Sequence, residues 1–129
     1  MNKWYLLLLT ISMAAFLSGD ASAGSLGDAP PDDGEDWEIT QYTFVWDEVI
    51  SINDLKLTET SGGLKLKNVI LYAEGDIEFG DNVEMIDTNF TYNKQSMSDS
   101  IWVYKQLSME NTTLGINSSA DHVFNGTGE

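Results

Sequence analysis

The sequence contains no cysteine and no arginine, and these two absences exclude several kinds of protein. Without cysteine the fold is not held by disulfides, so its stability has to come from packing and backbone pairing. Six lysines face 21 acidic residues, which gives a formal net charge of −15. Such a charge repels phosphate backbones and anionic lipid headgroups, so we expect no binding to nucleic acid or to membrane surfaces.

Histidine occurs only once, at His122. A lone histidine without cysteine or neighbouring ligands does not predict a metal site, and it supports no Ser-His-Asp arrangement. The absence of arginine excludes a lyase mechanism with an arginine base. Paired carboxylates can hydrolyse glycosides, but the outward Glu84 and Glu110 stand at different strand positions and nothing marks them as a pair. We therefore predict no catalytic residues, no metal site and no cofactor.

The first 23 residues have the form of a secretory signal peptide. Lys3 precedes an apolar run over residues 4–17, and Ala21-Ser22-Ala23 has the pattern of a cleavage site. The apolar run is shorter than the roughly 20 residues that span a bilayer. We expect export with cleavage after Ala23 and a secreted or cell-surface location, while a retained membrane anchor is the alternative.

Residues 24–36 read GSLGDAPPDDGED, a composition that predicts a disordered acidic linker. Its cluster of Asp32, Asp33, Glu35 and Asp36 has the charge to attract Ca²⁺, but it lacks the glycine-centred loop that gives such sites their geometry. We interpret the cluster as solvated charge. A module stabilised by Ca²⁺ is a further hypothesis, and it predicts a higher melting temperature in millimolar Ca²⁺.

From residue 37 onwards, apolar and polar residues alternate in short runs. The alternating sets are Trp37 and Ile39; Tyr42, Phe44 and Trp46; Ile50 and Ile52; and Leu55 and Leu57. A period of two in short runs separated by Gly, Asn and Asp predicts half-buried strands. No stretch keeps a helical period for three turns, so we predict one all-β domain over residues 37–129.

One phrase of eight residues occurs three times. It reads LKLKNVIL at 64–71, VEMIDTNF at 83–90 and LSMENTTL at 107–114, with the form apolar, x, apolar, x, Asn or Asp, x, x, apolar. Upstream of the phrase, Ile77 aligns with Ile101 and Phe79 with Val103. The length varies mainly in one loop, which is longest at 92–100, and insertions confined to one loop are typical of stacked repeats.

A repeat of about 20 residues that holds two or three short strands predicts one turn of a coil. Stacking buries the apolar face that a single turn exposes, because Leu64 then lies over Val83 and Val83 over Leu107, with strands about 4.8 Å apart. The predicted fold class is therefore a right-handed parallel β-helix, a solenoid of about three to four turns. An antiparallel β-sandwich is the alternative.

The recurring Asn or Asp predicts a ladder along one corner of the coil, made by Asn68, Asp87 and Asn111. Asparagine tolerates the left-handed conformation that a corner needs, and its amide can bond its copies above and below. In this ladder Asp87 would accept hydrogen bonds from both amides. On an outward face, Lys65 is expected beside Glu84 as an opposite-charge pair worth ~0.2–1 kcal/mol.

The stretches DWEIT, ISINDLKL and SGGLKLKNVIL resemble the opening of secreted right-handed parallel β-helix repeat proteins of the pectate-lyase-like class, most of all the cell-surface members common among archaea. The resemblance covers about residues 37–129. It implies extracellular or surface placement and a carbohydrate-related or adhesive role. The turn Lys105-Gln106 departs from the Gly-Gly pair at 62–63, and the chain is short for the class. We expect a truncated piece of a longer coil, or an open end that pairs with another β-helix segment.

Two kinds of surface site follow from the predicted coil. Asn-x-Ser/Thr sequons begin at Asn89, Asn111, Asn117 and Asn125. In an exported chain such asparagines are candidate glycosylation acceptors. If Asn111 belongs to the corner ladder, it cannot carry a glycan. The remaining candidate acceptors are Asn89, which lies two residues past the corner, and Asn117 and Asn125, which are expected in loops.

Trp102 and Tyr104 alternate with the inward Ile101 and Val103, so they are expected to face outward together. Exposed aromatic side chains on a β-face form a candidate platform for stacking against sugars. The alternative is that the loop at 92–100 folds over them.

Two functions agree with these observations. The first is a non-catalytic secreted or cell-surface module with a structural or adhesive role that binds carbohydrate. The second is the amino-terminal portion of a polysaccharide lyase or glycoside hydrolase whose catalytic turns lie beyond residue 129.

Overall fold

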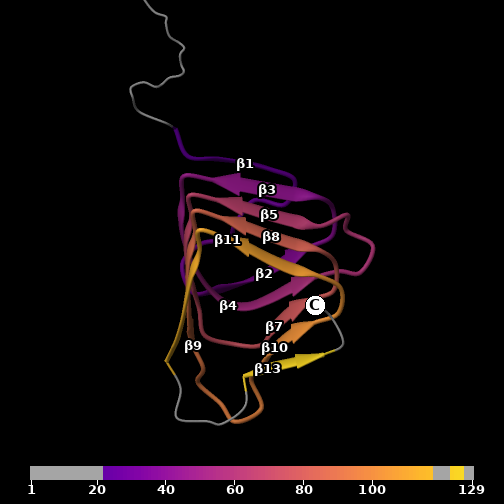
Figure 1. The fold of residues 1–129 in the computed structure, drawn as a ribbon, viewed down its shortest axis with the longest axis vertical. Helices are drawn as coiled ribbons and strands as arrows, with labels where there is room; N and C mark the ends of the chain where they lie inside the picture. The colour runs from indigo at the N-terminus through magenta and orange to yellow at the C-terminus, as the bar shows by residue number, and fades with distance from the viewer. Residues whose placement is uncertain (1–21, 118–122, 127–129) are drawn as a thin grey trace, which may run out of the picture.

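The computed structural model describes residues 22–117 and 123–126, and within these ranges the chain forms strands and turns but no helix. The strands are β1 (Gly24–Leu26), β2 (Glu35–Ile39), β3 (Thr43–Trp46), β4 (Val49–Leu57), β5 (Leu64–Lys67), β6 (Ile70–Ala73), β7 (Ile77–Phe79), β8 (Val83–Ile86), β9 (Asn89–Asn93), β10 (Ile101–Val103), β11 (Leu107–Glu110), β12 (Thr113–Asn117) and β13 (Phe124–Gly126). They stack as successive turns of one coil (Figure 1). All but the last two residues of the predicted signal peptide lie outside the described residues.

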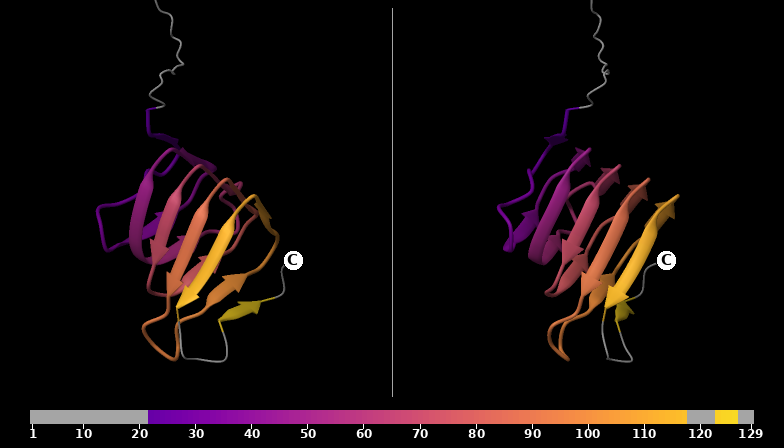
Figure 2. Two further views of the ribbon diagram at one scale, coloured as in Figure 1. Left: turned by 60° about the vertical axis from the view of Figure 1, so that its left-hand side comes forward. Right: turned by 90° about the vertical axis from the view of Figure 1, so that its left-hand side faces the viewer.

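Each turn of the coil crosses three faces. Face A is the sheet β1-β3-β5-β8-β11. The other sheet bends within β4. It gives face B, where Val49–Ile52 of β4 is followed by β6, β9 and β12, and face C, where β2, Leu55–Leu57 of β4, β7, β10 and β13 lie in that order. One turn, such as β7-β8-β9, passes from C to A to B, and the described strands complete about four turns (Figure 2).

The strands of neighbouring turns run parallel, and in the described part of the chain only the pair β1–β3 is antiparallel. The protein is therefore an all-β parallel solenoid, and the antiparallel sandwich is excluded. The predicted register is confirmed as well. Leu64 lies beside Val83 and Val83 beside Leu107, while Ile77 lies beside Ile101.

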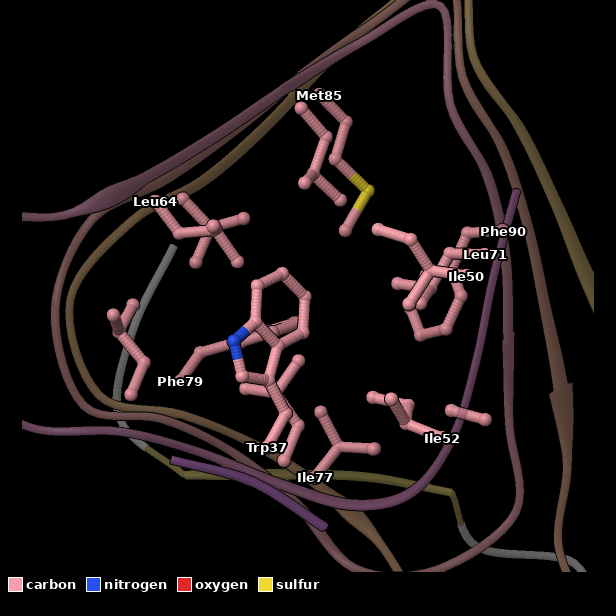
Figure 3. Close-up of a cluster of buried hydrophobic side chains, with 14 of the residues drawn as sticks. Trp37, Ile50, Ile52, Leu64, Leu71, Ile77, Phe79, Met85 and Phe90 are labelled. Carbon is pink, nitrogen blue, oxygen red and sulfur yellow. The ribbon is translucent and has the colours of Figure 1, made fainter. Parts of the chain in front are cut away.

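The core is a column of apolar side chains inside the coil. Side chains from all three faces point into one interior, as Figure 3 shows for Leu64 and Met85 from face A, Leu71 from face B and Ile77 from face C. Each of these four is at most 2% exposed. Burial of this apolar surface is the main force that holds the turns together.

The largest fully buried side chain, Tyr92, brings a polar atom into this core. It lies beside the small Ala73 of the preceding turn, and its hydroxyl donates to the carbonyl of Gly75 at 2.7 Å. Burial raises the pKa of the Tyr92 hydroxyl, so it stays protonated and keeps this bond.

A fourth copy of the repeat, TFVWDEVI at residues 43–50, was not predicted. Thr43 pairs with Leu64 and Val45 with Leu66, and both Thr43 and Val45 are fully buried. The alternating set Tyr42, Phe44 and Trp46 therefore occupies the outward positions, while Thr43 and Val45 are the inward residues. The polar Thr43 hides the copy in the sequence, yet it is tolerated inside because its hydroxyl donates to the carbonyl of Gln41.

The corner between faces A and B is occupied by the predicted asparagine and aspartate positions. Asn68, Asp87 and Asn111 have positive φ angles of 55°, 50° and 49°, and Asp47 in the fourth copy has 56°. The amide of Asn68 donates to Asp47 at 2.7 Å, and the amide of Asn111 donates to Asp87 at 2.6 Å. Asp and Asn alternate along the corner, so each amide donates to a carboxylate of the preceding turn. The expectation that Asp87 accepts from both amides is therefore wrong, because Asn68 donates to Asp47 instead.

A second ladder, at the corner between faces B and C, was not predicted. Here each carboxylate accepts the backbone N–H of the next turn: Asp36 from Asp54 at 3.1 Å, Asp54 from Asp76 at 2.8 Å, and Asp76 from Ser100 at 3.1 Å. These residues directly precede the first inward residue of face C in each turn. A Cβ at Gly75 would collide with the Asp54 carboxylate, so the ladder at this corner requires glycine at position 75.

The prediction of a disordered linker over residues 24–36 is wrong. β1 lies antiparallel on β3, and Glu35 and Asp36 belong to β2. Between them, the carboxylate of Asp28 accepts the backbone N–H of Thr40 at 2.7 Å, and the indole of Trp37 donates to the Asp28 carbonyl at 3.0 Å. The bond from Thr40 and a further bond from Gln41 hold the pKa of Asp28 below its usual value. The polar groups of this segment thus form hydrogen bonds that attach it to the first turn of the coil.

The last turn is less covered than the others. Met109 and Ile116 occupy inward positions yet are 36% and 43% exposed, whereas Met85 and Tyr92 at the same positions one turn earlier are 0% exposed. Since β11 and β12 end their faces in the described part of the chain, their inward side chains have a neighbouring turn on one side only.

The corner ladder can be tested at Asn68 with two substitutions that both remove the amide. Alanine is strained at a φ of 55° and glycine is not, so we expect Asn68→Ala to be less stable than Asn68→Gly by about 1 kcal/mol. Urea denaturation monitored by circular dichroism measures the difference. Lys67→Ala at the exposed neighbouring position is the control, with an expected change within about 0.5 kcal/mol. Equal or greater stability of the alanine variant would contradict the role of the left-handed corner.

Candidate functional site

The corner between faces C and A contains a buried carboxylate. Asp81 is held by the backbone N–H of Gly62 at 2.9 Å and of Asn82 at 2.8 Å, and the ammonium of Lys105 lies 3.1 Å from its Oδ1. Gly62 and Gly63 have φ angles of 100° and 116°, which side chains rarely adopt. The loop at Gly62 and Gly63 therefore wraps around the carboxylate of Asp81, which belongs to the next turn of the coil.

The environment of Asp81 favours its charged form. Burial acts to raise the pKa of this carboxyl, but the N–H groups of Gly62 and Asn82 and the charge of Lys105 outweigh burial and hold the pKa below its usual value. Asp81 is thus a permanent anion at neutral pH, and it fixes Lys105 on the adjacent turn.

Lys105 also shapes the surface of face C. Besides Asp81, its ammonium donates to the backbone carbonyl of Glu59 at 3.2 Å. This bond ties down the turn at residues 58–60, which leads from face C to the glycine pair. The turn forms one wall of a groove of about 600 Å³ on the outside of face C, lined by Lys56, Thr58, Glu59, Glu78, Tyr104 and Lys105.

Of the two aromatic residues predicted to face outward together, Tyr104 lines this groove and Trp102 lies beside Tyr104. The rings of Trp102 and Tyr104 are nearly parallel, with an angle of 9° between their planes and 6.2 Å between their centres. Tyr104 is 43% exposed and lines the groove, so the loop at 92–100 does not bury it. Trp102 is half-buried and pairs in register with Glu78, whose side chain also lines the groove. The aromatic pair and the groove therefore form one surface, which we call the face C site.

The face C site contains both charged and aromatic groups. Lys56 and Lys105 supply ammonium groups, and Glu59 and Glu78 supply carboxylates. This mixture can hydrogen-bond hydroxyl groups as donor and acceptor, while the aromatic rings provide an apolar surface. The groove was not predicted, because its wall comes from residues 58–60, more than 40 positions before the aromatic pair. The alternation of Trp102 and Tyr104 with inward residues was the one signal in the sequence.

The sequon asparagines occupy four different settings. Asn111 is in the corner ladder and its amide is bonded to Asp87. Asn89 is the exposed first residue of β9 on face B. The prediction that Asn117 and Asn125 lie in loops is wrong, since Asn117 ends β12 and Asn125 is the half-buried middle residue of β13. The sequence after Leu114 lacks a clear alternation of apolar and polar residues, so it does not indicate these two strands. Glycosylation of Asn89, Asn117 or Asn125 stays a prediction.

Within the described residues, no group of three or more His, Asp or Glu side chains is arranged to hold a metal ion. In the acidic cluster that we interpreted as solvated charge, the carboxylate of Asp36 accepts hydrogen bonds from the amide of Asn53 and from the backbone N–H of Asp54. The outward Glu84 and Glu110 belong to different turns, on β8 and β11. His122 lies outside the described residues.

Comparison with known proteins adds no relative. No protein-family model, no curated protein and no solved structure matches this chain. In its described part, the chain has no helix of the length and apolarity needed to cross a membrane. The parallel β-solenoid is shown by the strand pairing alone.

The buried Asp81 predicts a defined pH dependence of stability. Its folded-state pKa lies below the ordinary value of 3.8, so its stabilising effect is complete above that value and is lost as the pH falls through the folded-state pKa. We expect Asp81→Asn to lower the free energy of unfolding by about 1–3 kcal/mol at pH 7, and the loss to shrink as the pH falls below about 3.8. Urea denaturation across pH 2–7 measures this.

Asp33→Asn, at an exposed position in the acidic segment, is the matched control. A destabilisation by Asp81→Asn that is the same at every pH would show that the charge of Asp81 has no role.

Proposed function

We propose that the protein is a non-catalytic, secreted or cell-surface β-solenoid module that binds carbohydrate at the face C site and serves a structural or adhesive role. The observation that carries this proposal is the parallel pair of Trp102 and Tyr104 beside a groove lined by charged side chains. Aromatic rings stack against the apolar faces of sugar rings, and polar groups placed around them set the orientation of the ligand.

The way the site is supported favours binding over simple surface exposure. Tyr104 is adjacent in sequence to Lys105, whose ammonium is fixed by the buried Asp81 and by the carbonyl of Glu59. The groove wall and the aromatic platform are therefore joined by one side chain. A site on paired strands with such support is largely formed before the ligand arrives, which lowers the entropic cost of binding.

The cell-surface assignment and the pectate-lyase-like class are parts of the same proposal. They rest on the signal-peptide pattern at residues 1–23 and on the stretches DWEIT, ISINDLKL and SGGLKLKNVIL, whose residues form most of β2, β4 and β5. The net charge of −15 suits a surface module that stays soluble and avoids anionic lipid.

Carbohydrate binding can be tested on a glycan array with the full chain and its variants. We expect Trp102→Ala and Tyr104→Ala each to weaken binding of the recognised glycan by about tenfold, which corresponds to the loss of one stacking contact of about 1.4 kcal/mol. Tyr72→Ala is the matched control, because Tyr72 is 47% exposed but lies on face B. Equal binding by all three variants and the parent would refute the site.

Export can be tested separately. Expression of the full chain in a host with a secretory pathway is expected to yield an extracellular protein whose first peptide, by mass spectrometry, begins at Gly24. Ala23→Arg, which disrupts the small-residue pattern of the cleavage site, is expected to leave the amino-terminal segment attached. Accumulation of unprocessed parent protein inside the cells would overturn the predicted export.

A further inference from the structure

A second groove lies on face A, directly across the corner from the face C site. It has a volume of about 290 Å³, and its side-chain lining includes Tyr42, Lys65, Asn82, Glu84, Gln106 and Ser108. Tyr42 is 49% exposed, and Asn82 and Gln106 are exposed as well. We call this the face A groove.

The two grooves are separated by very little of the chain. In the turn after β4, residues up to Thr60 line the face C site and residues from Gly62 line the face A groove. One turn later Gly80 lines the first and Asn82 the second. The residues between them, Ser61 and Asp81, are buried, so their side chains turn inward under the corner.

In the last of these turns of the coil, the lining residues of the two grooves are consecutive in the sequence. Lys105 lines the face C site, and Gln106 lines the face A groove. The two grooves thus lie on either side of the same corner in three successive turns of the coil. A chain-like ligand that occupies both grooves has to pass over this corner.

The groups in the face A groove suit an uncharged, hydroxyl-rich ligand. The amides of Asn82 and Gln106 both donate and accept hydrogen bonds. Lys65 and Glu84 neutralise each other in an ion pair of 3.8 Å, the pair that the alternation of outward residues predicts. The lining of the face C site has two lysines and two glutamates, and because Lys105 also compensates the buried Asp81, this site has a net charge of −1. The two grooves therefore carry only about one of the 15 excess negative charges of the chain.

An extended peptide suits this track less well. Peptides commonly bind to sheets by adding a strand at an open edge. The grooves lie on the outside of strands such as β5, β7 and β8, which are already paired on both sides. Recognition on such a surface depends on side chains alone, that is, on stacking by Tyr42, Trp102 and Tyr104 and on polar groups between them.

Resting on the proposed carbohydrate binding, we propose that the ligand is the interior of a neutral polysaccharide chain, which crosses the corner at Asp81 and occupies both grooves at once. The site then recognises a run of sugar residues and has no need of a chain end. Binding at both grooves joins two contacts through one ligand, so affinity increases with chain length until both grooves are filled.

The test is a glycan array on which several neutral saccharides are each printed as dimer, tetramer and hexamer, with acidic saccharides alongside. For the recognised sugar we expect the hexamer to bind the full chain at least about tenfold more tightly than the dimer. Tyr42→Ala and Gln106→Ala are expected to remove this gain with length and to leave dimer binding unchanged. Trp102→Ala is expected to weaken binding at every length.

The outcomes separate the two proposals. Tyr72→Ala is again the matched control, since it removes an equally exposed tyrosine from face B, and it should change nothing. Equal affinity for dimer and hexamer with no effect of Tyr42→Ala or Gln106→Ala would overturn the two-groove track while leaving the face C site intact. Preference for an acidic saccharide, still lost in Trp102→Ala, would overturn the neutral ligand only. Indifference to Trp102→Ala at all lengths would refute both.

Discussion

The structure depends on one constraint, the fixed register between successive parallel turns. Leu64, Val83 and Leu107 lie in one column, so each turn buries the apolar surface of its neighbours. A turn by itself has too little core to be stable, and each gains most of its stabilisation from the turns on either side. A shift of one residue would turn the inward side chains outward, which explains why the alternation is kept so strictly in β5, β8 and β11.

The three corners meet this constraint with different polar chemistry. Between faces A and B, left-handed Asp and Asn alternate, and amides bond carboxylates of the preceding turn. Between B and C, aspartates accept backbone N–H groups of the next turn. Between C and A, the buried carboxylate of Asp81 is compensated by two N–H groups and Lys105. A chain without disulfides thus fixes its register at each corner with side-chain hydrogen bonds. Much of its excess of aspartate is used in this way.

The proposed binding surface is a consequence of the third corner. Asp81 cannot be buried unpaired, because an uncompensated buried charge is strongly destabilising, and the ammonium that compensates it comes from the turn that also presents Tyr104. The same lysine holds the turn at residues 58–60, so the groove wall and the aromatic platform are positioned by the group that stabilises the fold. Lys105 therefore both stabilises the fold and positions the proposed binding site, so a substitution of Lys105 is expected to lower both stability and binding.

The sequence predicted the parallel coil and the column positions from Leu64 to Leu114, because inward residues recur at similar intervals and each turn of the coil contacts only its neighbours. It also indicated the outward pair Trp102 and Tyr104 by alternation. It did not reveal the fourth repeat, where Thr43 replaces an apolar residue, or the strands and bonds formed by residues 24–36, whose composition is that of a loop. Residues 58–60, Asp81 and Lys105 meet at one corner only in the folded coil, and two grooves flank that corner. Loops and outward positions are not bound by the repeat, so what they contact depends on how the turns are stacked in space.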